Sequence, residues 1–88
     1  MTQVTVKRVV PAQGGLLKVR IDGTDLVFSS DTAKRNLPEG DHALQWFAKG
    51  VSGTKYKVEI TAPATATWKE EAKIDASGNA AGLHWIVI

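Results

Sequence analysis

The sequence predicts an all-β protein, a single β-sandwich of about seven short antiparallel strands. Three observations support this fold class. Apolar and polar residues alternate in several stretches, as Leu17, Val19 and Ile21 do with Lys18 between the first two, and this period of two is typical of strands with one buried face. Clusters of turn-forming residues separate these stretches at short intervals. The 88 residues (1–88) are enough for one domain with a thin core.

The alternating stretches place the strands, in chain order, at 2–10, 15–22, 25–29, 41–49, 54–62, 66–75 and 82–88. The turns between them are AQGG, DGTD, LPEGD, KGVSGT, TAPAT and DASGNAAG. One helical turn is expected over 31–38, because Asp31 is a suitable N-cap and a proline at position 38 ends a helix. No other stretch shows a helical spacing of apolar residues.

The last stretch, LHWIVI, is apolar on both faces. A strand of this kind is usually central in its sheet, or its second face meets a partner. We expect a central strand, with Leu83, Trp85 and Val87 facing the core and His84 facing outward.

Composition limits the possible functions. The chain has 11 basic and 9 acidic residues, a net charge of +2 and no cysteine. No disulfide or thiolate metal site is therefore possible. The basic residues are scattered rather than clustered, so we expect no nucleic acid partner. No stretch resembles a signal peptide or a membrane span, so we expect no membrane partner. The location stays open between the cytoplasm and, if a signal was removed, export.

His42 follows a turn built on Pro38 and Gly40, in the stretch LPEGDHALQW. It shares the phase of Leu44 and Trp46, which are natural core residues, so its ring is expected to point inward at the open end of the strand. There an imidazole can bond to a backbone carbonyl and fix the turn, as a tyrosine does in sandwich domains. We therefore interpret His42 as structural.

The same stretch, residues 37–46, resembles the L-x-x-G-x-Y-x-V entry to a strand in bacterial immunoglobulin-like and fibronectin type III-like modules. His42 stands where the aromatic residue usually is. The resemblance implies an immunoglobulin-like sandwich. In those families only two strands follow this corner, whereas three are expected here, so the strand topology is expected to differ. No functional residue is carried over from the resemblance.

The sequence offers little for catalysis or metal binding. The only two histidines, His42 and His84, match no compact ligand motif. There is no cysteine nucleophile, and no serine lies in a G-x-S-x-G context. The Asp22–Asp25 stretch, DGTD, is better explained as a hairpin turn than as a calcium loop. We expect no enzyme activity, no metal and no cofactor.

The three tryptophans carry the remaining functional hypotheses. Trp46 and Trp85 lie in phase with apolar neighbours and are expected in the core as structural residues. Trp68 is open: it either packs at the core or its rim, or it is an exposed contact residue, in which case the candidate binding residues are Trp68, Lys69, Glu71 and Lys73. We expect a non-catalytic binding or assembly module that contacts another protein, or a second copy of itself, through a sheet edge or loops. The alternative is a carbohydrate-binding module that uses an exposed tryptophan.

Overall fold

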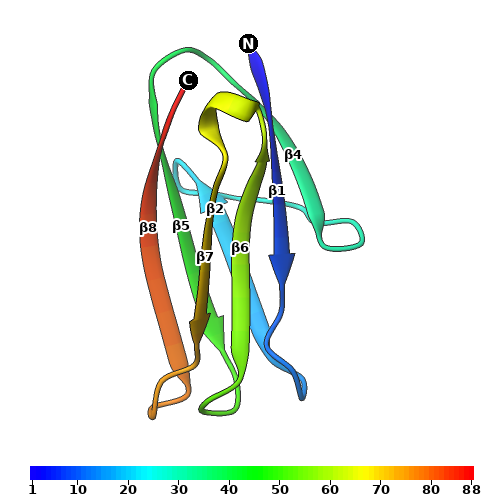
Figure 1. Cartoon of the computed structure of the whole chain (residues 1–88), viewed down its shortest axis with the longest axis vertical. Helices are drawn as coiled ribbons and strands as arrows, with labels where there is room; N and C mark the ends of the chain where they lie inside the picture. The colour runs from blue at the N-terminus through cyan, green and yellow to red at the C-terminus, as the bar shows by residue number, and fades with distance from the viewer.

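The computed structural model describes residues 1–88 as eight strands and one 3-10 turn (Figure 1). The strands are β1 (Thr2–Val9), β2 (Leu16–Ile21), β3 (Thr24–Asp25), β4 (Thr32–Leu37), β5 (Asp41–Lys49), β6 (Lys55–Ala62), β7 (Trp68–Lys73) and β8 (Asn79–Val87), and the turn is Ala64–Ala66. They form two antiparallel sheets of four strands that pack face to face. Sheet A has the order β4-β1-β6-β7 and sheet B the order β3-β2-β5-β8. The predicted all-β sandwich is confirmed, with eight strands instead of seven.

The core lies between the two sheets. Alternation along β1, β2, β5 and β6 sends one residue in two inward, which is the reason that the sequence pattern located these strands well. The buried apolar residues are Val4, Val6, Leu17, Val19, Ile21, Leu26, Ala33, Leu37, Leu44, Trp46, Ala48, Tyr56, Val58, Ile60, Ile74 and Ile86.

The expected helical turn over 31–38 is wrong, because this segment is strand β4, paired with β1 along its whole length. Arg35 hides the alternation of this strand in the sequence, because it is a charged residue on the same inward face as Ala33 and Leu37. The Arg35 guanidinium donates a bond to the carbonyl of Ile21, at 3.2 Å, so a charged side chain stands where alternation would place an apolar one. The expected strand over 25–29 is also shorter than predicted, since β3 has only two residues.

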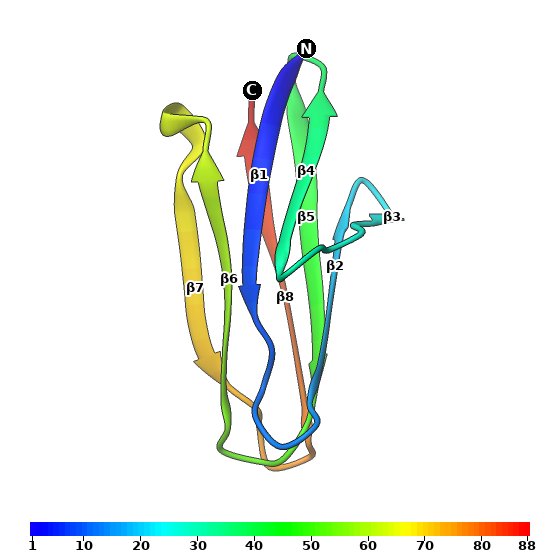
Figure 2. The same ribbon diagram turned by 90° about the vertical axis from the view of Figure 1, so that its right-hand side faces the viewer.

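The two sheets end together at each side of the sandwich. At one side sheet A ends in β7 and sheet B ends in β8, and at the other side they end in β4 and β3 (Figures 1 and 2). The C-terminal strand was expected to be central, and this expectation is wrong. β8 is an edge strand that pairs only with β5, so an apolar strand borders solvent at this side.

Candidate binding surface

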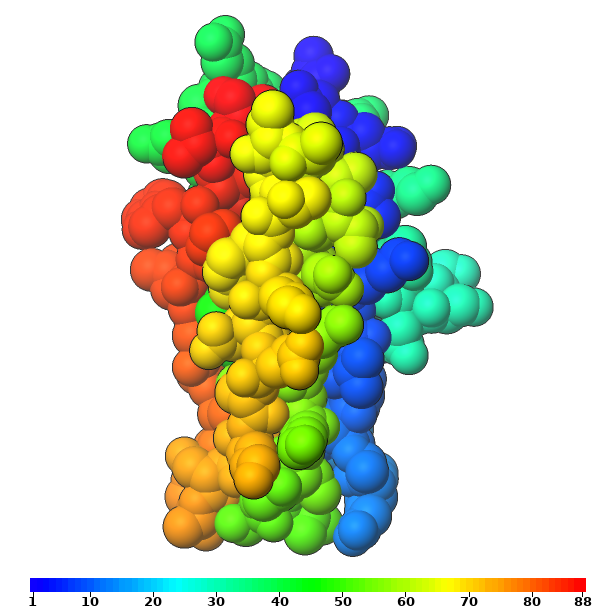
Figure 3. All heavy atoms as spheres, viewed as in Figure 1, coloured from blue at the N-terminus to red at the C-terminus, as the bar shows by residue number.

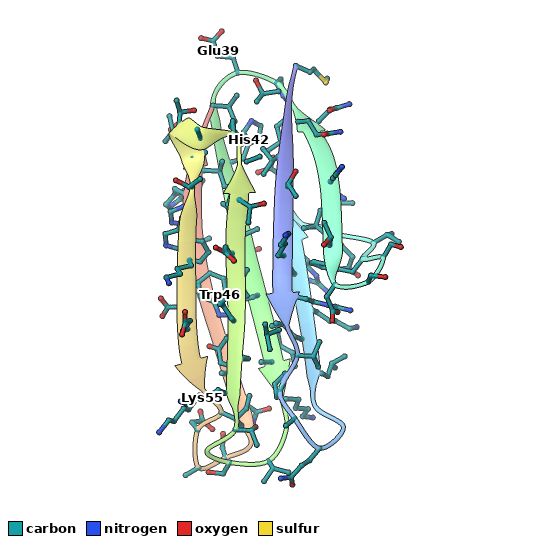
Figure 4. The ribbon with its side chains drawn as sticks, turned by 45° about the vertical axis from the view of Figure 1, so that its right-hand side comes forward. Glu39, His42, Trp46 and Lys55 are labelled. Carbon is teal, nitrogen blue, oxygen red and sulfur yellow. The ribbon has the colours of Figure 1, made fainter.

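His42 lies at the end of the sandwich, next to the turn that contains Glu39 (Figure 4). It is 7% exposed. Its Nδ1 donates to Asp22 Oδ2 at 2.6 Å, and its Nε2 donates to the carbonyl of Pro38 at 2.7 Å. The hydrogen bond to Asp22, followed by the one to the Pro38 carbonyl, raises the pKa of His42, since both oxygens accept a proton from the charged imidazole. Both ring nitrogens are therefore engaged within the chain.

Asp22 connects this histidine to the neighbouring strand. Its other carboxylate oxygen, Oδ1, accepts the backbone N–H of Ala43 at 3.0 Å. The hydrogen bond from His42, followed by the one from Ala43, lowers the pKa of Asp22. The result is an ion pair that joins the start of β5 to the turn after β2. No group of three or more histidine, aspartate or glutamate side chains in the structure could hold a metal ion.

An aromatic cluster fills the space between the sheets at the side formed by β7 and β8. The ring of Trp68 lies 5.4 Å from that of Trp46 and stacks on His84, with 4.1 Å between centroids and 6° between planes. The Nε1–H of Trp46 donates to the hydroxyl of Tyr56 at 3.3 Å. Gly82 lies opposite Trp46 on β8, and its lack of a side chain leaves room for the indole.

The structure does not bring the four candidate binding residues of β7 together. Trp68 faces inward and is half-buried against the core. Lys69, Glu71 and Lys73 are exposed on the opposite face of the strand, where Lys69 Nζ lies 3.4 Å from Glu71 Oε1. The indole of Trp68 therefore does not share a face of β7 with the three charged side chains.

Trp85 was expected in the core, and this expectation is wrong. It is 58% exposed on the outer face of sheet B, with Leu83 and Val87 exposed beside it in the same phase. The inward residues of this segment are His84 and Ile86 instead, so His84 does not face outward as expected. A shift of one residue moves every side chain of a strand to the other face, and a run that is apolar on both faces does not reveal its phase.

The outer face of sheet B combines apolar and basic side chains. In the register of the sheet, Phe47 lies between Lys18 on β2 and Ala81 on β8, and Ala43 lies opposite Trp85. A shallow groove of about 490 Å³ crosses β2 and β5 on this face. Its lining residues are Leu16, Lys18, Arg20, Gln45, Trp46, Phe47 and Lys49.

The backbone of β8 has one open edge. Gly40 and Ile88 exchange both of their backbone hydrogen bonds, at 3.0 and 2.9 Å. In an antiparallel ladder such pairs alternate with pairs that make no bond to each other. The residues of β8 that bond to β5 are therefore the even-numbered ones. The odd-numbered ones direct their N–H and C=O groups away from the sheet, and within the apolar stretch they are Ala81, Leu83, Trp85 and Val87.

The three other edge strands are protected and β8 is not. Charged residues on an edge strand discourage pairing with another chain. β7 carries Lys69, Glu70, Glu71 and Lys73, β4 carries Lys34 and Arg35, and β3 has only two residues. β8 has nine residues and no aspartate, glutamate, lysine or arginine. It borders the side of the molecule along its length (Figure 3). We call the open edge of β8 with its four outward residues, Ala81, Leu83, Trp85 and Val87, the β8 edge.

Comparison of the chain with protein-family models, with curated proteins and with solved structures finds no match. The structure has no helix that is both long and apolar enough to span a lipid bilayer.

Proposed function

We propose that this protein is a non-catalytic binding or assembly module that contacts another protein through the β8 edge. One observation carries the proposal. The residues whose backbone groups are open, among them Leu83, Trp85 and Val87, are also the residues whose apolar side chains are exposed. An extended segment that pairs with a sheet edge gains main-chain hydrogen bonds from the open groups and apolar contacts from the side chains beside them.

The exposed apolar side chains that a partner would bury support this surface as a contact site. Leu83, Trp85 and Val87 are 51%, 58% and 65% exposed, and they are consecutive along one column of the strand. An exposed, long and apolar edge is normally avoided in proteins because it pairs with other chains. A partner strand on the β8 edge would remove both the open backbone groups and the apolar column from water.

The immunoglobulin-like character of the domain belongs to this proposal. Its support is the two-sheet sandwich and the resemblance of residues 37–46 to a strand entry in such modules. The strand pairing has its own pattern. β1 and β2 lie in different sheets, whereas the first two strands of immunoglobulin domains share one sheet. What this domain would share with those modules is the use of a rigid sandwich as a recognition platform.

The proposal is tested by blocking the open edge alone. The N–H of Leu83 points away from β5, so Leu83→Pro removes an edge donor and leaves the ladder with β5 in place. Phe47→Ala is the matched control, because Phe47 is exposed on the same face but lies on a central strand. Proteins retained by the immobilised chain are identified, purified and titrated against all three forms. Binding lost in Leu83→Pro and kept in Phe47→Ala supports the proposal, whereas equal binding by all three contradicts it.

Carbohydrate binding is the second candidate, and the exposure of Trp85 favours it. An indole that is 58% exposed on a flat sheet face offers a surface on which a sugar ring can stack. This role passes to Trp85, since Trp68 faces inward. A glycan array probed with the wild-type chain, Trp85→Ala and Phe47→Ala tests it. Signals lost in Trp85→Ala support sugar binding, and an array without any signal contradicts it.

A further inference from the structure

We propose that the partner of the β8 edge is a second copy of this chain, paired antiparallel through β8 about a two-fold axis. This inference rests on the proposed function and names its partner. The two four-stranded B sheets would then join into one continuous sheet. A two-fold arrangement uses the same surface on both copies and closes on itself, so it ends at a dimer.

The positions of the open backbone groups select one register. A hydrogen-bonded antiparallel pair needs an outward-pointing residue on each strand. All open backbone groups of the β8 edge are paired when Leu83 of one copy lies opposite Trp85 of the other, and Ala81 lies opposite Val87. The two-fold axis then passes beside His84. In this register every open N–H and C=O of the four residues finds a partner, whereas any shift along the strand leaves some of them unpaired.

The side chains fit the same register. It sets each aromatic Trp85 beside an aliphatic Leu83, and each larger Val87 beside a small Ala81. Aromatic and aliphatic residues opposite each other on one sheet face stabilise the pairing of their strands. The two exposed columns of β8 would form one continuous apolar strip across the joined outer faces.

The charges favour a second copy over a charged segment. β8 has no formally charged residue, so the strand offers nothing that selects a charged partner and nothing that repels its own copy. The flanking strand β5 carries Asp41 beside Val87 at one end and Lys49 beside Asn79 at the other. An antiparallel arrangement places the acidic end of one copy toward the basic end of the other, whereas a parallel arrangement would place like charges together.

The first test measures the molecular mass in solution over a range of chain concentrations. The wild-type chain, of 9.5 kDa, is expected to reach twice this mass. Leu83→Pro and Leu83→Lys are expected to stay monomeric, because the first removes an edge donor and the second places a charge in the apolar strip. Phe47→Lys is the matched control, because the same charge on a central strand should leave the dimer intact. Thermal melting of each variant confirms that it is folded.

The second test probes the register and uses the absence of cysteine from the chain. Residues in a hydrogen-bonded antiparallel pair lie about 5.5 Å apart at Cα, within the range that a disulfide spans. A mixture of Leu83→Cys chains and Trp85→Cys chains is expected to form disulfide-linked dimers under mild oxidation. Each variant alone is expected to form few. Efficient cross-linking of either variant with itself, or none in the mixture, would overturn the proposal.

The failure of this inference is distinguishable from the failure of the proposed function. A wild-type chain that stays monomeric up to millimolar concentration, or a dimer that survives both Leu83 substitutions, overturns pairing between β8 strands. In either case a purified foreign partner that still binds the wild-type chain and not Leu83→Pro would leave the proposed function standing.

Discussion

The indole of Trp68 lies flat on the imidazole of His84, with 4.1 Å between ring centroids and 6° between ring planes. Trp68 belongs to the edge strand of sheet A, and His84 belongs to the edge strand of sheet B. The stack therefore joins the two sheets where both of them end. It closes this side of the core beneath Trp46 while leaving the outer face of β8 free.

Trp68 and Trp85 are expected to differ sharply in their contribution to stability. Trp68→Ala should cost about 3 kcal/mol, the low end for loss of a buried tryptophan, because the ring is half-buried and packed against the core. Trp85→Ala should change the free energy of unfolding by less than about 0.5 kcal/mol, as is usual at exposed positions. Both values come from denaturant unfolding at low chain concentration. Equal costs for the two substitutions would contradict the placement of these side chains.

His84 is expected to make the fold sensitive to acid. Burial lowers the pKa of His84 below its ordinary value of 6.5. The unfolded chain then binds the proton more tightly than the folded chain does, so this contribution to stability is present above about pH 6.5 and falls as the pH drops below it. His84→Phe keeps an aromatic ring against Trp68 and removes the titration. The wild-type chain should lose more stability than this variant between pH 7 and pH 5, and parallel curves would disprove the effect.

His42 and Asp22 are expected to stabilise the fold within a limited pH window. The pKa of His42 is raised above 6.5, so its contribution is complete below that pH and is lost as the pH rises through the folded-state pKa. The pKa of Asp22 is lowered below 3.8, so its contribution is present above that pH and is lost in stronger acid. The pair is thus most stabilising between about pH 4 and pH 6.5.

Two substitutions separate the charge of this pair from its hydrogen bonds. His42→Ala should cost about 1–2 kcal/mol near pH 6, since it removes a buried ring together with its hydrogen bonds to Asp22 and to the carbonyl of Pro38. Asp22→Asn suits the left-handed backbone at this position, φ 51°, and keeps an acceptor for the N–H of Ala43. It should weaken the loss of stability that the wild-type chain shows between pH 6 and pH 9. Unfolding curves at the two pH values measure this, and an unchanged loss would refute the charged pair.

Gly82 is expected to tolerate no side chain while Trp46 is present. A Cβ built at Gly82 would lie 2.1 Å from Cζ2 of Trp46, so Gly82→Ala should cost about 1–3 kcal/mol through overpacking. In a Trp46→Leu background, where the indole is absent, the same substitution should cost much less. Thermal unfolding of the four chains gives the coupling between the two sites. If the destabilisation caused by the two substitutions were simply additive, the indole would not lie over Gly82.

The fold class could be predicted from the sequence because the alternation that carries it is local. Leu17, Val19 and Ile21 reveal their strand regardless of which neighbour it pairs with. β4 could not be predicted in this way. Arg35 lies at an inward-facing position there. Its hydrogen bond to the carbonyl of Ile21 is a tertiary contact that no local sequence pattern predicts. Edge or central position is likewise a property of pairing between distant segments, which is why β8 was misplaced.

The candidate surface was largely hidden in the sequence for a related reason. Leu83, Trp85 and Val87 resemble core residues, and only the burial of His84 and Ile86 on the opposite face excludes them from the core. Gly82 is the residue in the sequence that could have indicated which face of β8 points to the core. A glycine in the same phase as His84 indicates a face where another side chain approaches closely, and here that side chain is the indole of Trp46.

Most connections in this chain cross from one sheet to the other. Only β2 with β3 and β6 with β7 are consecutive strands that pair. Neither sheet can therefore form as a series of hairpins, because the other four strand pairs join strands that are not consecutive in the chain. Domains dominated by such distant pairings fold in milliseconds to seconds. During that interval β8, the last strand of the sandwich in chain order, has no β5 ladder to hold it. A newly made sandwich thus remains open to association until β8 has docked on β5, and high expression levels should favour misassembly at this step.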